Sequence, residues 1–150
     1  MARAPFQVIV IPFRTDSTKQ LNYLVFRRSD LNVWQWIAGG GEGNEKPEQT
    51  ARREAFEEAG IPQNSRLIPL DSIASIPATI FSDRNLWGAD VHVIPEYSFG
   101  IEADNSDIRL SDEHSVWEWL NYETAQSRLK WDSNKTALWE LNRRLSVMNE

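Results

Sequence analysis

Residues 39–61 read GGGEGNEKPEQTARREAFEEAGI, and their local structure is the clearest in the chain. Three consecutive glycines predict a turn. Pro47 suits the first position of a helix, because its missing N–H would have no partner there anyway. Gly60 suits the left-handed position just beyond a helix end. The stretch therefore predicts a glycine-rich turn followed by a helix from about Pro47 to Ala59.

The predicted helix carries three glutamates on one face. Glu54, Glu57 and Glu58 are spaced i, i+3 and i+4, so their side chains lie within one turn. Like charges at this spacing destabilise a helix, and the helix dipole disfavours anions near the C-terminal end. Either the face is solvated, with Arg53 pairing with Glu57, or the carboxylates bind a hard divalent cation such as Mg²⁺, which prefers oxygen ligands. The charge pattern alone leaves both readings open.

The spacing of these residues resembles the signature of the Nudix hydrolases. Asn44 stands where the commonest form of that signature has a glycine. The resemblance implies an α/β (α+β) fold, with a mixed β-sheet in an α/β/α sandwich. The positions that match the signature are Gly39, Glu45, Arg53, Glu54, Glu57, Glu58 and Gly60.

Shorter stretches resemble the bacterial dihydroneopterin triphosphate pyrophosphatases, a Nudix subgroup close to the dATP pyrophosphohydrolases. They lie at residues 26–28, 34–35, 80–82, 96–99, 113–114, 119–120 and 131–134, with Ala137. This likeness implies that Arg27 and Ser133 contact substrate and that Glu113 is a metal ligand from outside the helix. A ligand from a distant strand would also complete the shell of a cation bound by helix carboxylates. The subgroup often has a threonine where this chain has Ala38.

Composition limits the classes of function. The chain has 150 residues, which predicts one domain over residues 1–150. A formal charge of −6 argues against broad binding to nucleic acid or membranes, which requires a basic surface. There is no cysteine for disulfides or thiol chemistry, and no apolar run of transmembrane length. The cytoplasm is the expected location, and the oligomeric state is left open.

Alternating and apolar runs predict strands around the helix. Strands are expected near residues 6–13 and 23–27, which should pair, and near residues 34–37. Of Trp34 and Trp36, which share a face, one is expected in the core and the other could stack on a base. Further strands are expected near residues 65–75, 78–81, 91–101 and 113–120, with residues 82–90 forming a polar loop that is either a flap or a hairpin tip. Short C-terminal helices should follow Asn121 and Asp132 or Ser133, the second with Ala137, Leu138, Leu141 and Leu145 on its buried face.

The Nudix resemblance implies metal-dependent cleavage of a phosphoanhydride bond. The expected substrate is a nucleotide or pterin triphosphate of the dATP or dihydroneopterin triphosphate type, which would yield a monophosphate and pyrophosphate. Mg²⁺, or alternatively Mn²⁺, would neutralise the phosphates, and Glu54 is nominated as the general base. Arg53 would orient Glu57 and hold the helix to the glycine turn. The expected metal ligands are Glu54, Glu57, Glu58 and Glu113; the catalytic groups are Glu54, Glu57 and Arg53; the substrate contacts are Arg27, Gly39, Gly40 and Ser133.

Other functions remain open at this stage. The substrate could instead be a dinucleoside polyphosphate or a nucleotide sugar. The same fold could also serve as a non-catalytic sensor, because fold does not determine function. A sensor would be expected to have lost signature carboxylates, and none is lost here. A plain structural domain with an acidic helix would show no stabilisation by metal.

Overall fold

The computed structural model describes residues 2–104, 107–111 and 114–148. Within these residues four strands precede the first α-helix and three follow it, two α-helices come last, and two short 3-10 helices follow the fifth strand. None of the described helices is long and apolar enough to cross a membrane. The elements are β1 (Arg3–Thr15), β2 (Leu21–Arg28), β3 (Trp34–Gln35), β4 (Ile37–Glu42), α1 (Pro47–Ala59), β5 (Leu67–Pro77), η1 (Ala78–Ile80), η2 (Ser82–Leu86), β6 (Val93–Glu102), β7 (His114–Leu120), α2 (Tyr122–Arg128) and α3 (Asp132–Met148).

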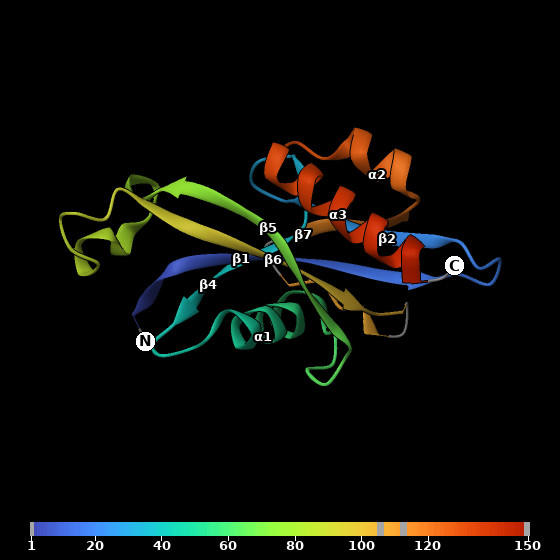
Figure 1. The fold of residues 1–150 in the computed structure, drawn as a ribbon, viewed down its shortest axis with the longest axis horizontal. Helices are drawn as coiled ribbons and strands as arrows, with labels where there is room; N and C mark the ends of the chain where they lie inside the picture. Colours follow the sequence, from blue (N-terminus) through green and yellow to red (C-terminus); the bar gives the residue numbers. More distant parts are fainter. Residues whose placement is uncertain (1, 105–106, 112–113, 149–150) are drawn as a thin grey trace.

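The strands form one mixed sheet of seven strands. Its main order is β3-β2-β1-β6-β5, with β4 paired to β1 and β7 paired to β2. The pairing of β1 with β6 is parallel, and the other pairings are antiparallel. Helix α1 covers one face of the sheet, and α2 and α3 cover the other (Figure 1). The predicted α/β/α sandwich around a mixed sheet is therefore confirmed.

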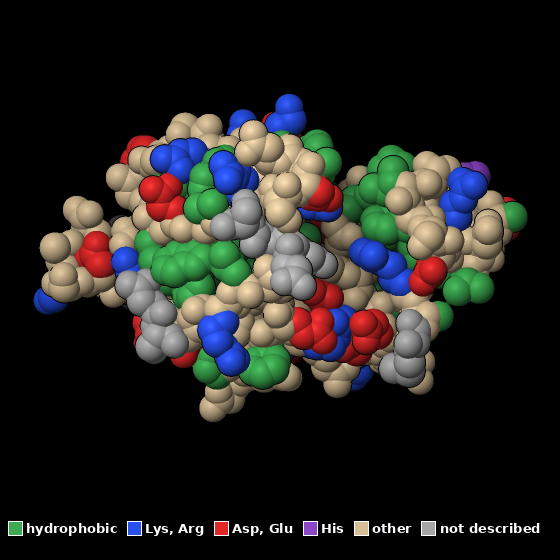
Figure 2. Space-filling model, turned by 180° about the vertical axis from the view of Figure 1, so that it is seen from behind, with side chains coloured by type: hydrophobic (Ala, Val, Ile, Leu, Met, Phe, Trp, Pro, Cys, Tyr) green, Lys and Arg blue, Asp and Glu red, His purple; other side chains and the backbone are tan. Residues whose placement is uncertain are grey.

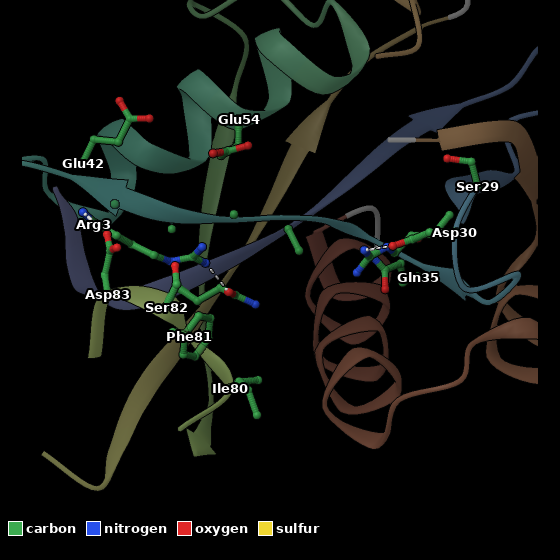
Figure 3. A pocket seen from close by; sticks show the side chains of 16 residues that line it. Arg3, Ser29, Asp30, Gln35, Glu42, Glu54, Ile80, Phe81, Ser82 and Asp83 are labelled. Atoms are coloured by element: carbon green, nitrogen blue, oxygen red, sulfur yellow. Dashed lines mark hydrogen bonds and ion pairs between the residues drawn. The ribbon is translucent and has the colours of Figure 1, made fainter. Parts of the chain in front are cut away.

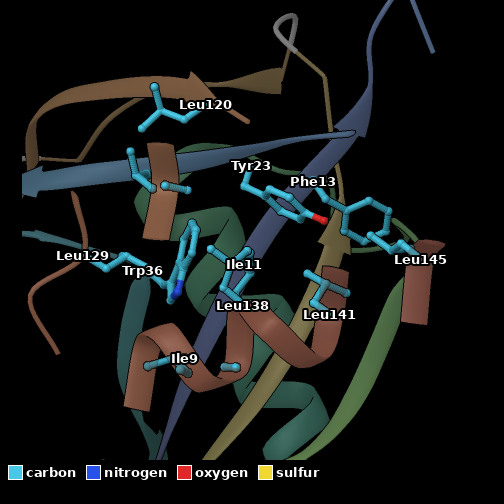
Figure 4. Packing of buried hydrophobic residues seen from close by; sticks show 13 residues of the cluster. Ile9, Ile11, Phe13, Tyr23, Trp36, Leu120, Leu129, Leu138, Leu141 and Leu145 are labelled. Atoms are coloured by element: carbon cyan, nitrogen blue, oxygen red, sulfur yellow. The ribbon is translucent and has the colours of Figure 1, made fainter. Parts of the chain in front are cut away.

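Each face of the sheet has its own core. Side chains alternate along β1, so Ile9 and Ile11 face α3, while Val8 and Val10 face α1. Trp36 is fully buried in the core under α3, and Trp34 packs against that core from its rim. The buried face predicted for the last helix is observed (Figure 4); it consists of Ala137, Leu138, Leu141 and Leu145.

Helix α1 has the predicted bounds, and both of its ends have local causes. Pro47 occupies the first turn, and Gly60 ends the helix in the left-handed region at φ 73°. The cap N–H of Gly60 donates to the carbonyl of Phe56 at 2.9 Å. The first of the two predicted C-terminal helices is also confirmed, because the side chain of Asn121 caps α2 by accepting from the N–H of Thr124.

Two local predictions are wrong. The glycines 39–41 do not form a turn; they lie in strand β4, where Gly39 and Gly40 pair with Val8 and Gln7 of β1. The turn follows at Gly43, whose φ is 56°. Residues 78–80 form a 3-10 helix and not a strand. The pairing of β5 with β6 ends at Pro77, which has no N–H to donate to a sheet.

Candidate functional site

Arg53 joins the glycine strand to α1. Its guanidinium contacts Glu45 through Nε at 2.7 Å and through Nη2 at 3.0 Å. Nη1 donates to Glu54 Oε1 and Glu57 Oε2, both at 3.0 Å, and Nη2 donates to the carbonyl of Gly40 at 2.9 Å. In the rear view, acidic and basic side chains lie next to one another over the region of α1 (Figure 2). One guanidinium thus orients three carboxylates and fixes the helix against β4.

These ion pairs shift the acidity of their members. Hydrogen bonding to Arg53 lowers the pKa of Glu45 to about 2. The same hydrogen bonds raise the pKa of Arg53 above its usual range. Glu45 also accepts from the hydroxyl of Thr50 at 2.9 Å, so the carboxylate is held on two sides. Glu45 and Arg53 are therefore both ionised at neutral pH.

The three helix glutamates differ in their surroundings. Glu58 is buried at 4% exposure, beneath the loop whose Ser111 N–H donates to the Glu58 carbonyl at 3.1 Å. The Glu54 side chain is 13% exposed, and the Glu57 side chain is 54% exposed. Glu54 points from α1 toward β4 (Figure 3), and its carboxylate lies where the Cβ of any other residue at position 39 would be, with Oε2 2.6 Å from that point. Glycine at position 39 thus allows the carboxylate to reach the strand.

A cleft of about 790 Å³ opens along β4. The carboxylate of Glu54 and the glycine backbone form one wall, and η1 and η2 form the opposite wall (Figure 3). Arg28 lines the cleft at its other end, where it pairs with Asp30. Among the described strands β4 pairs with β1 alone, so its second edge faces this cleft. The cations and the glycine backbone of the cleft suit the phosphates of a ligand. The carboxylate of Glu54 lies in the same cleft.

Arg3 places a second cation on the glycine strand. A Cβ at position 40 would overlap its guanidinium, with Nη2 at 2.8 Å. The guanidinium stacks on Phe81, 4.6 Å from the ring centroid. The main chain of Arg3 accepts from Trp87 Nε1 at 2.7 Å and donates to Asp83 at 2.9 Å. The segment predicted as a polar loop is therefore fastened to β1 beside the cleft.

A smaller cavity of about 420 Å³ adjoins the cleft and shares Gln7, Arg28, Gln35, Ala38 and Ile80 with it. It lies between the sheet and the start of α3. Its own lining includes Glu96 of β6, Trp131 and Ser133. Asn134 secures this corner, because its side chain accepts from the N–H of Trp36 at 3.1 Å and its carbonyl accepts from Trp36 Nε1 at 3.0 Å. The two cavities are contiguous, and their linings differ: the larger one is bordered by arginines and glycine backbone, and the smaller one by Trp131 and Glu96.

The predicted site residues are only partly brought together. Glu54, Gly39 and Gly40 line the larger cleft, and Ser133 lines the smaller one. Arg27 lines neither, whereas its neighbour Arg28 lines both. Glu113 lies outside the described residues. The sequence favoured Arg27 over Arg28, although the pair Arg27 and Arg28 was read as a possible phosphate clamp at the end of its strand. It did not single out Arg3, Glu96 or Trp131 as site residues; the resemblances at 96–99 and 131–134 were the signal for the last two.

The oxygen donors on α1 suit a hard divalent cation in chemical type. Across the described ranges, however, no three His, Cys, Asp or Glu side chains are grouped so that they could hold a metal ion. Arg53 occupies the space between Glu54 and Glu57 and neutralises both. The carboxylates of α1 therefore suit a metal ion by their chemistry, and Arg53 holds two of them, Glu54 and Glu57, in position.

Comparison with known proteins gives consistent likenesses. The family model of the NUDIX domain matches residues 5–139. A solved Nudix protein from Listeria monocytogenes is 44% identical, with a TM-score of 0.85 and 97% of each chain covered. The Escherichia coli dihydroneopterin triphosphate pyrophosphohydrolase is 25% identical, with a TM-score of 0.73, over 95% of this chain and 99% of that one. The dihydroneopterin triphosphate diphosphatase of Haemophilus influenzae is 28% identical over 134 residues, 87% of this chain and 83% of that protein.

Proposed function

The chain belongs to the Nudix family of hydrolases, and we propose that it hydrolyses a phosphoanhydride bond of a nucleotide-like or pterin triphosphate. The products would be a monophosphate and pyrophosphate. The observation that carries the proposal is the position of Glu54, held by Arg53 and seated on Gly39 in the wall of a cleft of about 790 Å³. Residues 1–150 would act as one domain, in the cytoplasm.

The side chains have separate tasks in this proposal. Glu54 accepts the proton of the attacking water as the water oxygen bonds to phosphorus and the bridging P–O bond breaks. Arg53 donates to both the Glu54 and the Glu57 carboxylate and holds Glu54 in the wall of the cleft. Arg3 and Arg28 bind phosphate oxygens, for which guanidinium groups are well suited. The open backbone at Gly39 and Gly40 lets the phosphates approach closely.

Nudix hydrolases generally use divalent metal cations, and Mg²⁺ or Mn²⁺ is proposed here. Glu54, Glu57, Glu58 and Glu113 are the proposed ligands. A bound cation would supply charge neutralisation for the phosphates and a water of lowered pKa. Because the chain has a formal charge of −6, local cations are needed to attract a polyanionic substrate.

The pterin type of substrate is favoured by the relatives, which are named for dihydroneopterin triphosphate. The dATP type is proposed from the sequence resemblance alone. The smaller cavity supports a ring-bearing substrate, because it adjoins the phosphate cleft and is lined by Trp131. A dinucleoside polyphosphate or nucleotide sugar is the alternative. A small-molecule partner is proposed in either case, with no nucleic acid or membrane partner.

Product analysis tests this function. The common nucleoside triphosphates, dihydroneopterin triphosphate, a diadenosine polyphosphate and a nucleotide sugar are each incubated with Mg²⁺, Mn²⁺ or EDTA. We expect pyrophosphate and a monophosphate from a triphosphate, only with metal. The Glu54→Gln and Glu58→Gln variants should lose about 100-fold or more in rate, the scale of general base catalysis. Glu48→Gln, on the exposed first turn of the same helix, should keep the wild-type rate. Full activity in a folded Glu54→Gln or Glu58→Gln protein, or in EDTA, would refute the proposal.

A further inference from the structure

Glu96 is a buried carboxylate in the wall of the smaller cavity. It is 5% exposed, and it lies on the face of β6 that is covered by α3. Burial raises its pKa above the ordinary range, although hydrogen bonds from Gln7 and Ser133 oppose the shift. Burying a carboxyl group costs free energy unless its oxygen atoms accept hydrogen bonds. The residue therefore requires an explanation beyond packing.

Hydrogen bonds fix Glu96 as an acceptor. Arg3 Nη2 donates to Gln7 Oε1 at 2.7 Å, and Gln7 Nε2 donates to Glu96 Oε2 at 3.0 Å. Arginine only donates, so the oxygen of the Gln7 amide must face Arg3 and its nitrogen must face Glu96. Each carboxylate oxygen has two lone pairs, and these two protein donors leave acceptor capacity at the cavity wall.

Trp131 supplies the second part of a ring site. Its side chain is 46% exposed and lines the same cavity as Glu96. A partly exposed indole offers a flat surface on which any ring can stack. Stacking does not discriminate between bases, so selectivity must come from hydrogen bonds in the plane of the ring. Glu96 is a carboxyl group in the wall of this cavity, and the hydrogen bond from Gln7 holds it in place.

We infer that Glu96 selects substrates whose ring presents two adjacent N–H donors, the 2-amino-4-oxopyrimidine edge shared by guanine and pterins. One ring N–H and one amino N–H would donate to the two carboxylate oxygens. Adenine presents one donor beside one acceptor, so a carboxylate would face a lone pair and bind it less well. The inference rests on the proposed function for the identity of the site and narrows its substrate class.

A purely structural role for Glu96 makes a different prediction. If Glu96 only holds Gln7 in place, its replacement should weaken all ligands alike. If it contacts the ring, the loss should depend on the exocyclic amino group. Guanosine, inosine and adenosine monophosphates separate these cases, because inosine differs from guanosine only by lacking the 2-amino group. Monophosphates also report binding without any hydrolysis.

The experiment measures the Kd of GMP, IMP and AMP by calorimetry for the wild type, Glu96→Gln and Glu140→Gln. Glu140 is the matched control, because it is a largely buried carboxylate on α3 that binds the N–H groups of Asp71 and Ser72, outside both cavities. We expect the wild type to bind GMP about tenfold or more tightly than AMP, with IMP between them, as for a bidentate contact. Glu96→Gln should lose most of this preference, and Glu140→Gln should retain it.

Several results would overturn the inference: no measurable binding of GMP, equal binding of the three nucleotides by the wild type, or an equal loss for all three in Glu96→Gln. If Glu96→Gln does not fold, the wild-type comparison of GMP with IMP remains decisive. Hydrolysis is assayed separately with Mg²⁺. A protein that prefers GMP but cleaves no triphosphate would contradict the proposed function and leave the ring contact standing.

Discussion

Arg3 and Glu54 approach the same strand from opposite faces of the sheet. Glu54 lies against Gly39 on the α1 side, and Arg3 lies against Gly40 on the α3 side. The two glycines are adjacent, so their missing side chains would point in opposite directions. Burial lowers the pKa of Arg3, and the nearby negative charges of Glu54 and Asp83 oppose this shift. A cation and an anion thus flank one exposed strand edge.

The first prediction concerns Gly39. A methyl group at this position would overlap the Glu54 carboxylate, so Gly39→Ala should displace the proposed base. We expect kcat to fall by about 100-fold, the scale of general base catalysis, with a smaller change in KM. Gly41→Ala is the comparison, because its methyl group would meet the ring of Phe6 and not Glu54. We expect this variant to have a lower Tm but, at a temperature where the variant is folded, a kcat close to that of the wild type. A fully active Gly39→Ala enzyme would contradict the role of Glu54.

Arg3 should govern the affinity for phosphate. Arg3→Ala removes a guanidinium from the cleft, and KM for the triphosphate should rise about tenfold, as expected for one charge-assisted hydrogen bond. The kcat should change less, because Arg3 does not contact the proposed base. Arg66→Ala removes an exposed arginine that pairs with Glu102 and should leave KM unchanged. An unchanged KM in Arg3→Ala would exclude the phosphate contact.

Arg27 and Arg28 can be distinguished by the same measurement. The sequence predicts Arg27 as the substrate contact, whereas Arg28 lines the cleft. Arg28→Ala should therefore raise KM several-fold, which corresponds to a loss of about 1 kcal/mol of binding free energy. Arg27→Ala should have the smaller effect, because this residue lies within the sheet and pairs with Trp34 and Val116. A larger effect in Arg27→Ala would support the resemblance and contradict the geometry.

Glu45 should control stability in acid. Its pKa is lowered from 4.5 to about 2, so its stabilising effect is complete above pH 4.5 and is lost as the pH falls toward 2. We expect Glu45→Gln to lower the free energy of unfolding at pH 7 by about 2 kcal/mol, as for a hydrogen bond to a charged group. Urea unfolding at several pH values measures the gap to the wild type. That gap should narrow with acidification, and a constant gap would contradict the assignment.

Trp131 should bind rings without selecting among them. Trp131→Ala should weaken GMP, IMP and AMP by a similar factor, since stacking on one aromatic side chain contributes roughly 1–3 kcal/mol for any base. Trp139→Ala removes a more exposed tryptophan of α3 that lines neither cavity and should have no effect. Calorimetry of the three monophosphates checks this, and a loss confined to one of them would contradict it.

Local chemistry explains what the sequence predicted well. The bounds of α1 follow from Pro47 and Gly60, and the cap of α2 follows from Asn121. The glycines of β4 were mistaken for a turn because their extended conformation depends on pairing with β1, whose partner residues lie more than 25 residues earlier in every pair. Glycine has a weak strand preference of its own. A local reading therefore cannot predict this strand.

The rest of the site depends on contacts between distant parts of the chain. Gln7 and Glu96 are 89 residues apart, and Arg3 and Asp83 are 80 apart. Their meeting follows from the parallel pairing of β1 with β6 and from the segment between β5 and β6. No periodic pattern marks such residues. The signature correctly placed Glu54 on α1. The positions of Arg3 at the cleft and of Glu96 in the smaller cavity could be seen only in the folded structure.

The direction of the Gln7 amide would limit how the proposed preference for a ring could evolve. Arg3 presents donors to one end of the amide, so the other end always presents a donor to position 96. A mutation that placed a lysine at position 96 would set two donors against each other. A change to a ring that requires a donor there would therefore need a second mutation at position 3 or 7. Because Arg3 is also the proposed phosphate contact, a change in ring selectivity at position 96 would then be coupled to a change in phosphate binding at position 3.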